Sequence, residues 1–218
     1  MKHGQFIYIA GCDGTGKSTQ AELLMQRLSV QGVKAQHVWM RFPFFFSLPL
    51  LAYARWKRYS WHEERDGMHH GYWDFRRSWL LRRAFPWIFL LDAAIVALLR
   101  IYLPIWRGEN VVCERFVLDM LVDLIVACDD PALLNKPPVA WFIKLIPHRA
   151  NTVILELDAE TIRTRRPDLK TDCKLEARLQ AFRRIARNGA YPLISSALPV
   201  EVVQGRIWER ILQPNETA

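Results

Sequence analysis

A run of glycines followed by lysine and serine has a spacing that suits phosphate binding. The segment Gly11-Cys12-Asp13-Gly14-Thr15-Gly16-Lys17-Ser18 matches the pattern G-x-x-x-x-G-K-[ST] at every fixed position. Glycines let backbone N–H groups turn toward phosphate oxygens, and the helix that follows presents its positive end to them. The lysine of such a loop reaches the β- and γ-phosphates, and the next hydroxyl ligates Mg²⁺. We therefore expect ATP to be held by Gly11, Asp13, Gly14, Thr15, Gly16, Lys17, Ser18 and Thr19, with Ser18 as the Mg²⁺ ligand.

Further charged side chains follow other segments of the chain. Glu114 and Arg115 come directly after the apolar run 110–113, and three arginines follow a later one, at positions 163, 165 and 166. Transfer of a phosphoryl group between two anions needs cations around the moving group, and a lid that closes over it excludes water. Lys17, Mg²⁺, Arg115 and a lid arginine would supply that charge. The alternatives are a structural ion pair between Glu114 and Arg115 and an exposed basic helix face at 163–166.

The glycine loop resembles that of the thymidylate kinase family, with an acidic residue two positions after the first glycine and then Gly-x-Gly-Lys-Ser-Thr. Three other segments are similar to motifs of that family. Arg41-Phe42-Pro43 resembles its Arg-Phe-Pro segment, and Glu114-Arg115-Phe116 resembles its Asp-Arg-aromatic motif. Leu157-Asp158, followed by Arg163-Thr164-Arg165-Arg166, resembles its strand and arginine-bearing lid.

This resemblance implies a kinase that converts a nucleoside monophosphate, with dTMP as the best guess, to its diphosphate with ATP and Mg²⁺. The family divides by whether its catalytic arginine lies in the glycine loop or in the lid. Position 14 is glycine where the first group has arginine, so the chain resembles the lid-arginine group. The resemblance implies acceptor contacts from Asp13, Arg41, Arg115 and Phe116. It implies a catalytic set of Lys17, Glu114, Arg115, Arg163, Arg165 and Arg166.

Two departures from the family pattern leave the identity of the acceptor undetermined. Glu114 stands where the family has aspartate, and the arginine that reads the thymine base is missing, because no arginine lies between Arg83 and Arg100. The region 42–87 also departs from the pattern. A same-fold kinase acting on another phosphate or hydroxyl acceptor, such as a sugar or a lipid-linked phosphate, is therefore an alternative. A non-catalytic nucleotide-binding module is another.

Strand-like and helix-like apolar segments alternate along the chain, and they predict the elements that position these residues. We expect strands at 6–10, 36–40, 110–113, 152–157 and 200–203, and a loop at 131–138. We expect helices at 17–30, 71–83, 85–101, 119–128, 159–166, 175–187 and 206–212. This order predicts an α/β P-loop NTPase three-layer fold with a mainly parallel five-stranded sheet and helices on both faces. We expect a single domain over 1–218, with a short arginine-bearing lid at about 163–173 and a divergent acceptor region at about 42–87.

Composition bounds the partners and the location. The net charge of +8 over 218 residues suits phosphate-bearing partners. We expect nucleotide substrates and no nucleic acid, and leave a homodimer and a peripheral membrane contact open. Scattered cysteines without CxxC spacing fit a reducing cytoplasm. Asp92 and Arg100 interrupt the apolar run 85–106, which favours a core helix over a membrane span. The two charges either pair locally or line a rebuilt acceptor pocket.

Overall fold

The computed structural model describes residues 4–40, 45–65 and 68–212, and for 63–65 and 68–70 it describes the backbone only. Its main sheet is parallel and has five strands in the order β2-β5-β1-β6-β7. These strands are β1 (Phe6–Gly11), β2 (Ala35–Trp39), β5 (Asn110–Glu114), β6 (Asn151–Glu156) and β7 (Leu193–Ser195). The predicted α/β fold with a five-stranded sheet is therefore confirmed.

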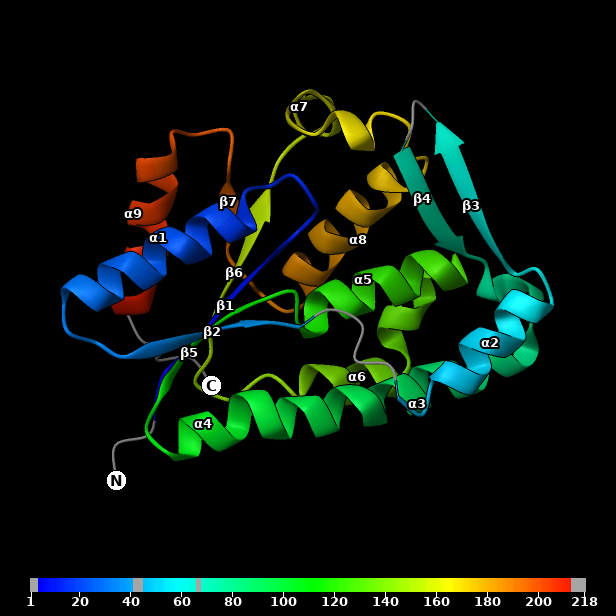
Figure 1. Cartoon of the computed structure of the whole chain (residues 1–218), viewed down its shortest axis with the longest axis horizontal. Coiled ribbons are helices and arrows are strands. Elements are labelled where there is room, and N and C mark those ends of the chain that lie inside the picture. Colours follow the sequence, from blue (N-terminus) through cyan, green and yellow to red (C-terminus); the bar gives the residue numbers. More distant parts are fainter. Residues whose placement is uncertain (1–3, 41–44, 66–67, 213–218) are drawn as a thin grey trace.

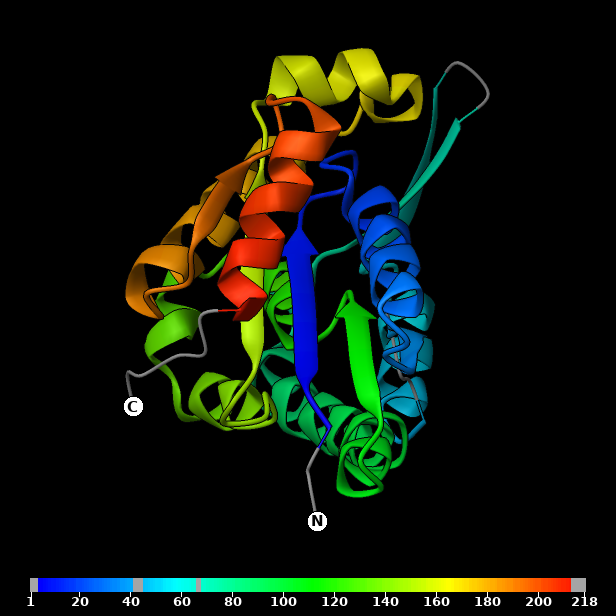
Figure 2. The same cartoon turned by 90° about the vertical axis from the view of Figure 1, so that its left-hand side faces the viewer.

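Helices cover both faces of this sheet (Figures 1 and 2). On one face, α1 (Lys17–Val30) and α9 (Val200–Leu212) pack on Ile7 and Ile9. On the other, α3 (Trp79–Ala97), α5 (Val117–Cys128) and α8 (Leu175–Asn188) pack on Phe6 and Tyr8. Successive strand residues point to opposite faces, so β1, which is apolar throughout, supplies both cores.

The helix α3 continues through a π-helical turn, Leu98–Tyr102, into α4 (Leu103–Trp106). One side of α3 lies in the core, with Leu81, Phe85, Phe89, Ala93 and Ala97 at most 3% exposed. The prediction of a core helix thus holds for one side only. By length and composition, Trp79–Trp106 is the one described helix that could cross a membrane, and 33% of its most apolar window is buried. Core helices pass the same test, and the arrangement is compatible with a soluble protein.

Asp92 is completely buried on α3 and holds the beginning of α2 (Leu48–Trp56). Its carboxylate accepts hydrogen bonds from the backbone N–H groups of Phe45, Phe46 and Ser47 at 2.9–3.0 Å. The Ser47 hydroxyl donates to the same carboxylate at 2.5 Å. Arg100 is exposed, and its carbonyl accepts from Gln36 Nε2 at 3.3 Å. The alternative in which Asp92 is satisfied locally is the one the structure shows.

Two predicted elements are wrong. Residues 71–83 are not one helix, because β3 (Ser60–Arg65) pairs with β4 (Met68–Trp73) in an antiparallel hairpin that ends before a 3₁₀ turn, Phe75–Arg77. Residues 200–203 are not a strand but the first turn of α9, despite three β-branched valines. Val203, Ile207 and Ile211 are buried at helical spacing on the sheet, so tertiary packing outweighs local propensity.

Short helices complete the chain. The predicted loop 131–138 contains a 3₁₀ helix, Pro131–Asn135, and the start of α6 (Pro137–Ile143). Prolines at the first positions of both helices lack only an N–H that would have no helical partner, so they start helices rather than break them. The predicted lid, at about 163–173, contains the end of α7 (Ala159–Arg165) and a 3₁₀ turn, Pro167–Leu169.

Candidate functional site

The glycine loop lies between the end of β1 and the beginning of α1. Gly14 and Gly16 have φ angles of 86° and 84°, in the left-handed region that glycine adopts without strain. A Cβ on Gly11 would lie 2.6 Å from the Leu155 carbonyl oxygen, so a larger residue does not fit there. The sequence thus folds locally into a loop whose backbone N–H groups and helix terminus suit phosphate oxygens.

Lys17 lies beneath this loop with 4% of its surface exposed. Its ammonium donates to the carbonyl oxygens of Gly11 at 2.6 Å and Cys12 at 2.8 Å, and it lies 3.7 Å from Asp13 Oδ1. Burial lowers the pKa of Lys17, and the nearby carboxylates of Asp119 and Asp13 oppose that shift. A phosphate would add the negative charge that favours the protonated amine.

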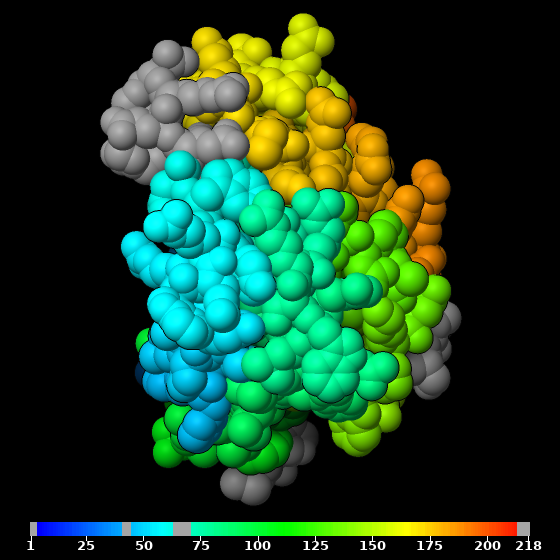
Figure 3. All heavy atoms as spheres, turned by 90° about the vertical axis from the view of Figure 1, so that its right-hand side faces the viewer, coloured from blue at the N-terminus to red at the C-terminus, as the bar shows by residue number. Residues whose placement is uncertain are grey.

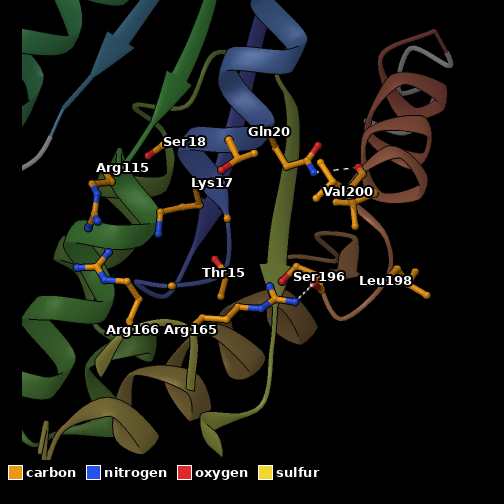
Figure 4. Close-up of a pocket in the computed structure, with 14 residues that line it drawn as sticks. Thr15, Lys17, Ser18, Gln20, Arg115, Arg165, Arg166, Ser196, Leu198 and Val200 are labelled. Carbon is orange, nitrogen blue, oxygen red and sulfur yellow. Dashed lines mark hydrogen bonds between the residues drawn. The ribbon is translucent and has the colours of Figure 1, made fainter. Parts of the chain in front are cut away.

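A cavity of about 370 Å³ opens over the loop (Figure 4). One wall is the loop and the start of α1, and the opposite wall comes from the lid and from the chain between β7 and α9. The described residues that line it include Gly14, Thr15, Gly16, Lys17, Ser18, Thr19, Arg115, Arg165, Arg166, Ser196 and Leu198. Most of the expected ATP-binding residues therefore border one cavity.

Ser18 and Glu114 meet at the edge of this site. The Ser18 hydroxyl donates to Glu114 Oε2 at 2.8 Å, and His37 Nε2 lies 2.9 Å from Glu114 Oε1. Glu114 is 2% exposed at the carboxyl end of β5, which runs parallel beside β1. A hydroxyl and a carboxylate in contact at this position match the oxygen ligands with which P-loop NTPases bind Mg²⁺.

Arg115 follows directly and has a φ of 59°, a conformation rare for residues other than glycine. Its guanidinium forms an ion pair with Asp13, and its side chain is 17% exposed. The alternative of a structural ion pair between Glu114 and Arg115 is therefore not what the structure shows. The backbone between β5 and α5 instead directs Glu114 toward Ser18 and Arg115 toward Asp13 in the glycine loop.

The three lid arginines take different directions. Arg163 pairs with Glu176 at 3.1 Å and does not line the cavity. Arg165 donates to the Ser196 carbonyl at 3.1 Å, whereas Arg166 pairs with Asp168 at 2.7 Å. In Figure 4 the Arg166 guanidinium lies on the side of Lys17 and Arg115, and Arg165 extends away toward Ser196.

Asp119 is a buried acid near the site that the sequence motifs do not indicate. Its carboxylate accepts from the Tyr8 hydroxyl at 2.7 Å, and that hydroxyl in turn accepts from the backbone N–H groups of Leu118 and Asp119. Burial raises the pKa of Asp119 to about 6, while the charge on Lys17 lowers it. The only sequence signal was an acidic residue in the first turn after the Glu114-Arg115-Phe116 segment.

The remaining predicted acceptor residues are Arg41, Phe116 and Asp13, and the two of them that the structure describes do not share a described cavity. Arg41 lies outside the described residues. Phe116 is completely buried, with its ring centroid 6.0 Å from that of Phe6 and 5.8 Å from that of Tyr8, and it borders none of the described cavities. Its prediction as an acceptor contact gains no support from this position. Asp13 borders a smaller hollow of about 20 Å³ with Arg115 and Asp119.

No protein-family model matches this chain, and no curated protein matches it. The similarity to thymidylate kinases thus stays a prediction that depends on the sequence motifs. The geometry adds one general point about chemistry. Lys17, Arg115 and Arg166 surround a cavity whose floor is a glycine loop, and this arrangement suits a ligand with several negative charges.

Proposed function

We propose that the chain is an ATP-dependent phosphotransferase of the thymidylate kinase type, which acts on nucleoside monophosphates in the cytoplasm. The observation that supports it most is the convergence of Lys17, Arg115 and Arg166 on the cavity above the glycine loop, with Ser18 also lining the cavity and bonded to Glu114. The presence of Lys17, Ser18 and Arg115 together argues against a module that only binds nucleotide. The parts of this site match what phosphoryl transfer requires.

In this proposal each residue has one role. The loop N–H groups and Lys17 would bind the donor's phosphates, and Ser18 and Glu114 would hold Mg²⁺, which would supply positive charge against those phosphates. Arg115 lies between the donor site and Asp13, where it can orient the acceptor's phosphate. Arg166 is placed to stabilise the charge that develops on the transferred phosphoryl group, and the lid excludes water from it.

The donor site is tested by Lys17→Ala. We expect this variant to lose phosphoryl transfer and to bind ATP more weakly. Lys17 is buried beneath the loop, where its ammonium can bind the β- and γ-phosphates of ATP. Release of ADP from ATP, with and without candidate monophosphates, measures the reaction. Activity within a few-fold of the wild type would contradict the assignment of the donor site.

The acceptor is tested by comparing kcat/KM for dTMP with the values for uridine, cytidine and purine monophosphates at fixed MgATP. The missing base-reading arginine removes a charged hydrogen bond of roughly 1.5–3 kcal/mol, so we expect dTMP to be handled with low specificity. A preference for dTMP above about 10³-fold would show that other residues read the base. Transfer to none of these monophosphates, but to a sugar or lipid-linked acceptor, would support the alternative kinase.

A further inference from the structure

The outer side of α3–α4 is apolar and uncovered. Its exposed side chains follow each other at intervals of seven, four, four and three residues, which places them in one line along the helix. They are 36–50% exposed: Leu80, Trp87, Leu91, Ile95 and Leu98. In Figures 1 and 2 this helix forms the lower edge of the molecule, with α6 on one side and α2 on the other. No described helix or strand lies below it. We call these five residues the apolar stripe.

Positive charge lies near both ends of the apolar stripe. Between residues 79 and 107 the only acidic residue is Asp92, which is buried, whereas arginines occupy positions 82, 83, 100 and 107. The Arg83 guanidinium lies 5.5 Å from the centroid of the Trp79 ring, and the Lys144 ammonium, directly after α6, lies 4.6 Å from that of Trp141. Both tryptophans are more than half exposed. Exposed tryptophans beside basic side chains are typical of protein surfaces at a membrane interface.

A groove of about 520 Å³ lies at the amino-terminal end of the apolar stripe, between α3 and the segment 131–138. Figure 3 shows this face, where the beginning of α3 lies between α2 and the segment that contains α6. Trp79, Trp87 and prolines form its apolar walls, and Arg82, Arg83 and Lys136 supply three cations. Asp130 pairs with Arg82 at 3.7 Å and with Lys136 at 2.5 Å. One carboxylate against three cations leaves the groove positive, which suits the phosphate of a lipid headgroup.

We propose that α3–α4 docks this protein on an anionic phospholipid bilayer, lying parallel to the membrane plane with the apolar stripe at the level of the headgroups. Burial of a helix's apolar side together with attraction between basic residues and anionic lipid is the physical basis of such binding. A membrane-spanning state would require the opposite side of α3 to leave the core, and it would strip Asp92 of its four hydrogen bonds.

Charge distinguishes this occupant from a second copy of the chain. Arginines lie near both ends of α3–α4, so pairing the helix with itself in either direction places cations near cations. The helix has no exposed acid that could neutralise them, and like charges across an interface disfavour it. An anionic bilayer complements the same charges.

The proposal is tested by flotation with vesicles of phosphatidylcholine alone and of phosphatidylcholine mixed with phosphatidylserine. We expect the wild type to bind the mixed vesicles and to dissociate as salt is raised. Leu91→Glu should weaken binding by about tenfold or more, and Arg83→Gln by about fivefold. The matched controls on the distant helix α9, Leu212→Glu and Arg206→Gln, should bind as the wild type does. Neither Leu91 nor Arg83 borders the ATP cavity, so ATP binding by the variants confirms that they fold.

Four results would overturn the proposal. The first is equal binding to vesicles with and without phosphatidylserine, and the second is an equal loss in the α9 controls. The third is a wild-type dimer that binds no vesicles and that Leu91→Glu converts to a monomer, which would make this surface a self-association interface. The fourth is recovery of the protein only in detergent, which would indicate a spanning helix. If Leu91→Glu does not fold, Leu98→Glu on the same stripe is the second variant, with the same expected loss.

Discussion

At the scale of single residues, each cation at the site has a partner that nucleotide phosphates would have to replace. Lys17 donates to two loop carbonyls, Arg115 pairs with Asp13, and Arg166 pairs with Asp168. Charge-assisted bonds to phosphate are stronger than bonds to neutral carbonyls, so the exchange at Lys17 favours the ligand. The pair of Arg166 and Asp168 is half exposed on the arginine side and contributes little to stability. Breaking this exposed pair therefore costs little, which leaves Arg166 able to turn toward a phosphate.

We therefore expect Arg166→Ala to lower kcat by roughly 10³-fold with little change in ATP affinity, because a lid arginine acts mainly on charge that develops in the transition state. Arg163→Ala is the matched control, since Arg163 lies on the same lid but pairs with Glu176 outside the cavity. Steady-state kinetics with MgATP gives both values. If Arg163→Ala lowers kcat as much as Arg166→Ala, or if both variants keep near-normal kcat, the catalytic arginine is not the one inferred from the cavity.

A second residue-scale prediction concerns Asp119, whose pKa burial raises to about 6 from an ordinary value near 3.9. Ionisation is disfavoured in the folded chain, so stability falls as pH rises from about 4 to about 6 and the loss is complete above that range. Two pKa units correspond to about 2.7 kcal/mol, and asparagine can still accept from Tyr8. Asp119→Asn should therefore raise the free energy of unfolding at neutral pH by up to about 2.7 kcal/mol.

Urea denaturation of the wild type and of Asp119→Asn over this pH range measures the effect. The variant should lose the part of the pH dependence that falls between about pH 4 and 6. The exposed Glu209→Gln on α9 serves as the control and should leave the profile unchanged. Identical profiles for wild type and Asp119→Asn would mean that Lys17 and Arg115 fully compensate the burial of the carboxylate.

At the scale of elements, one buried carboxylate joins two helices that are far apart in sequence. Asp92 on α3 accepts from the backbone N–H groups of Ser47, the N-cap of α2, and of Phe45 and Phe46, which precede that helix. The charge also lies at the positive end of α2, where an anion is favourable. This contact fixes where the divergent region begins after β2.

Asp92→Ala is expected to destabilise the protein by about 3 kcal/mol or more, because it leaves several buried donors without a charged acceptor. Asp92→Asn keeps one acceptor oxygen and should fall between the wild type and Asp92→Ala. Chemical denaturation measures both, with the exposed Glu209→Ala on α9 as a control that should change stability by less than about 0.5 kcal/mol. A loss of under about 1 kcal/mol in Asp92→Ala would show that water or other groups replace the carboxylate.

Local patterns predicted the elements of the sheet far better than the region inserted between β2 and β5. The strand 6–10 and the helix 17–30 are continuous patterns of one period, and the structure has them within a residue. The hairpin β3–β4 depends on pairing between Trp61 and Tyr72 and on cross-strand contacts that no local period encodes.

At the site, too, features formed by contiguous residues could be predicted, and those formed by distant segments could not. The glycine loop is contiguous in sequence, so most of the residues that border the cavity on that side could be predicted. The contacts of Glu114 with His37 and of Asp119 with Tyr8 join separate segments and depend on the sheet order. Ser196 and Leu198, which border the cavity, follow a strand that was predicted at the wrong place.

At the scale of the whole molecule, β1 lies at the centre of the sheet and contributes to both apolar cores, and the glycine loop continues from it. We expect a single cooperative unfolding transition over the whole chain, since neither core can form without β1. MgATP at about 100 times its dissociation constant should raise Tm by about 5–10 °C, and Lys17→Ala should abolish this shift. Calorimetry with and without MgATP tests both statements. Two separate transitions would contradict the single domain.

The lid and the glycine loop also restrict each other's evolution. A Cβ on Gly14 would lie 3.1 Å from Ile162 Cγ2 and 3.3 Å from Arg166 Cγ, and its φ of 86° strains any other residue. An arginine at position 14 would therefore strain the backbone and require Ile162 and Arg166 to shift by a few tenths of an ångström. If the lid supplies the catalytic charge, as we propose, moving that charge to the loop is easier after a change in the lid that relieves these two contacts. The order of mutational steps between the two arrangements is thus constrained by two side-chain contacts.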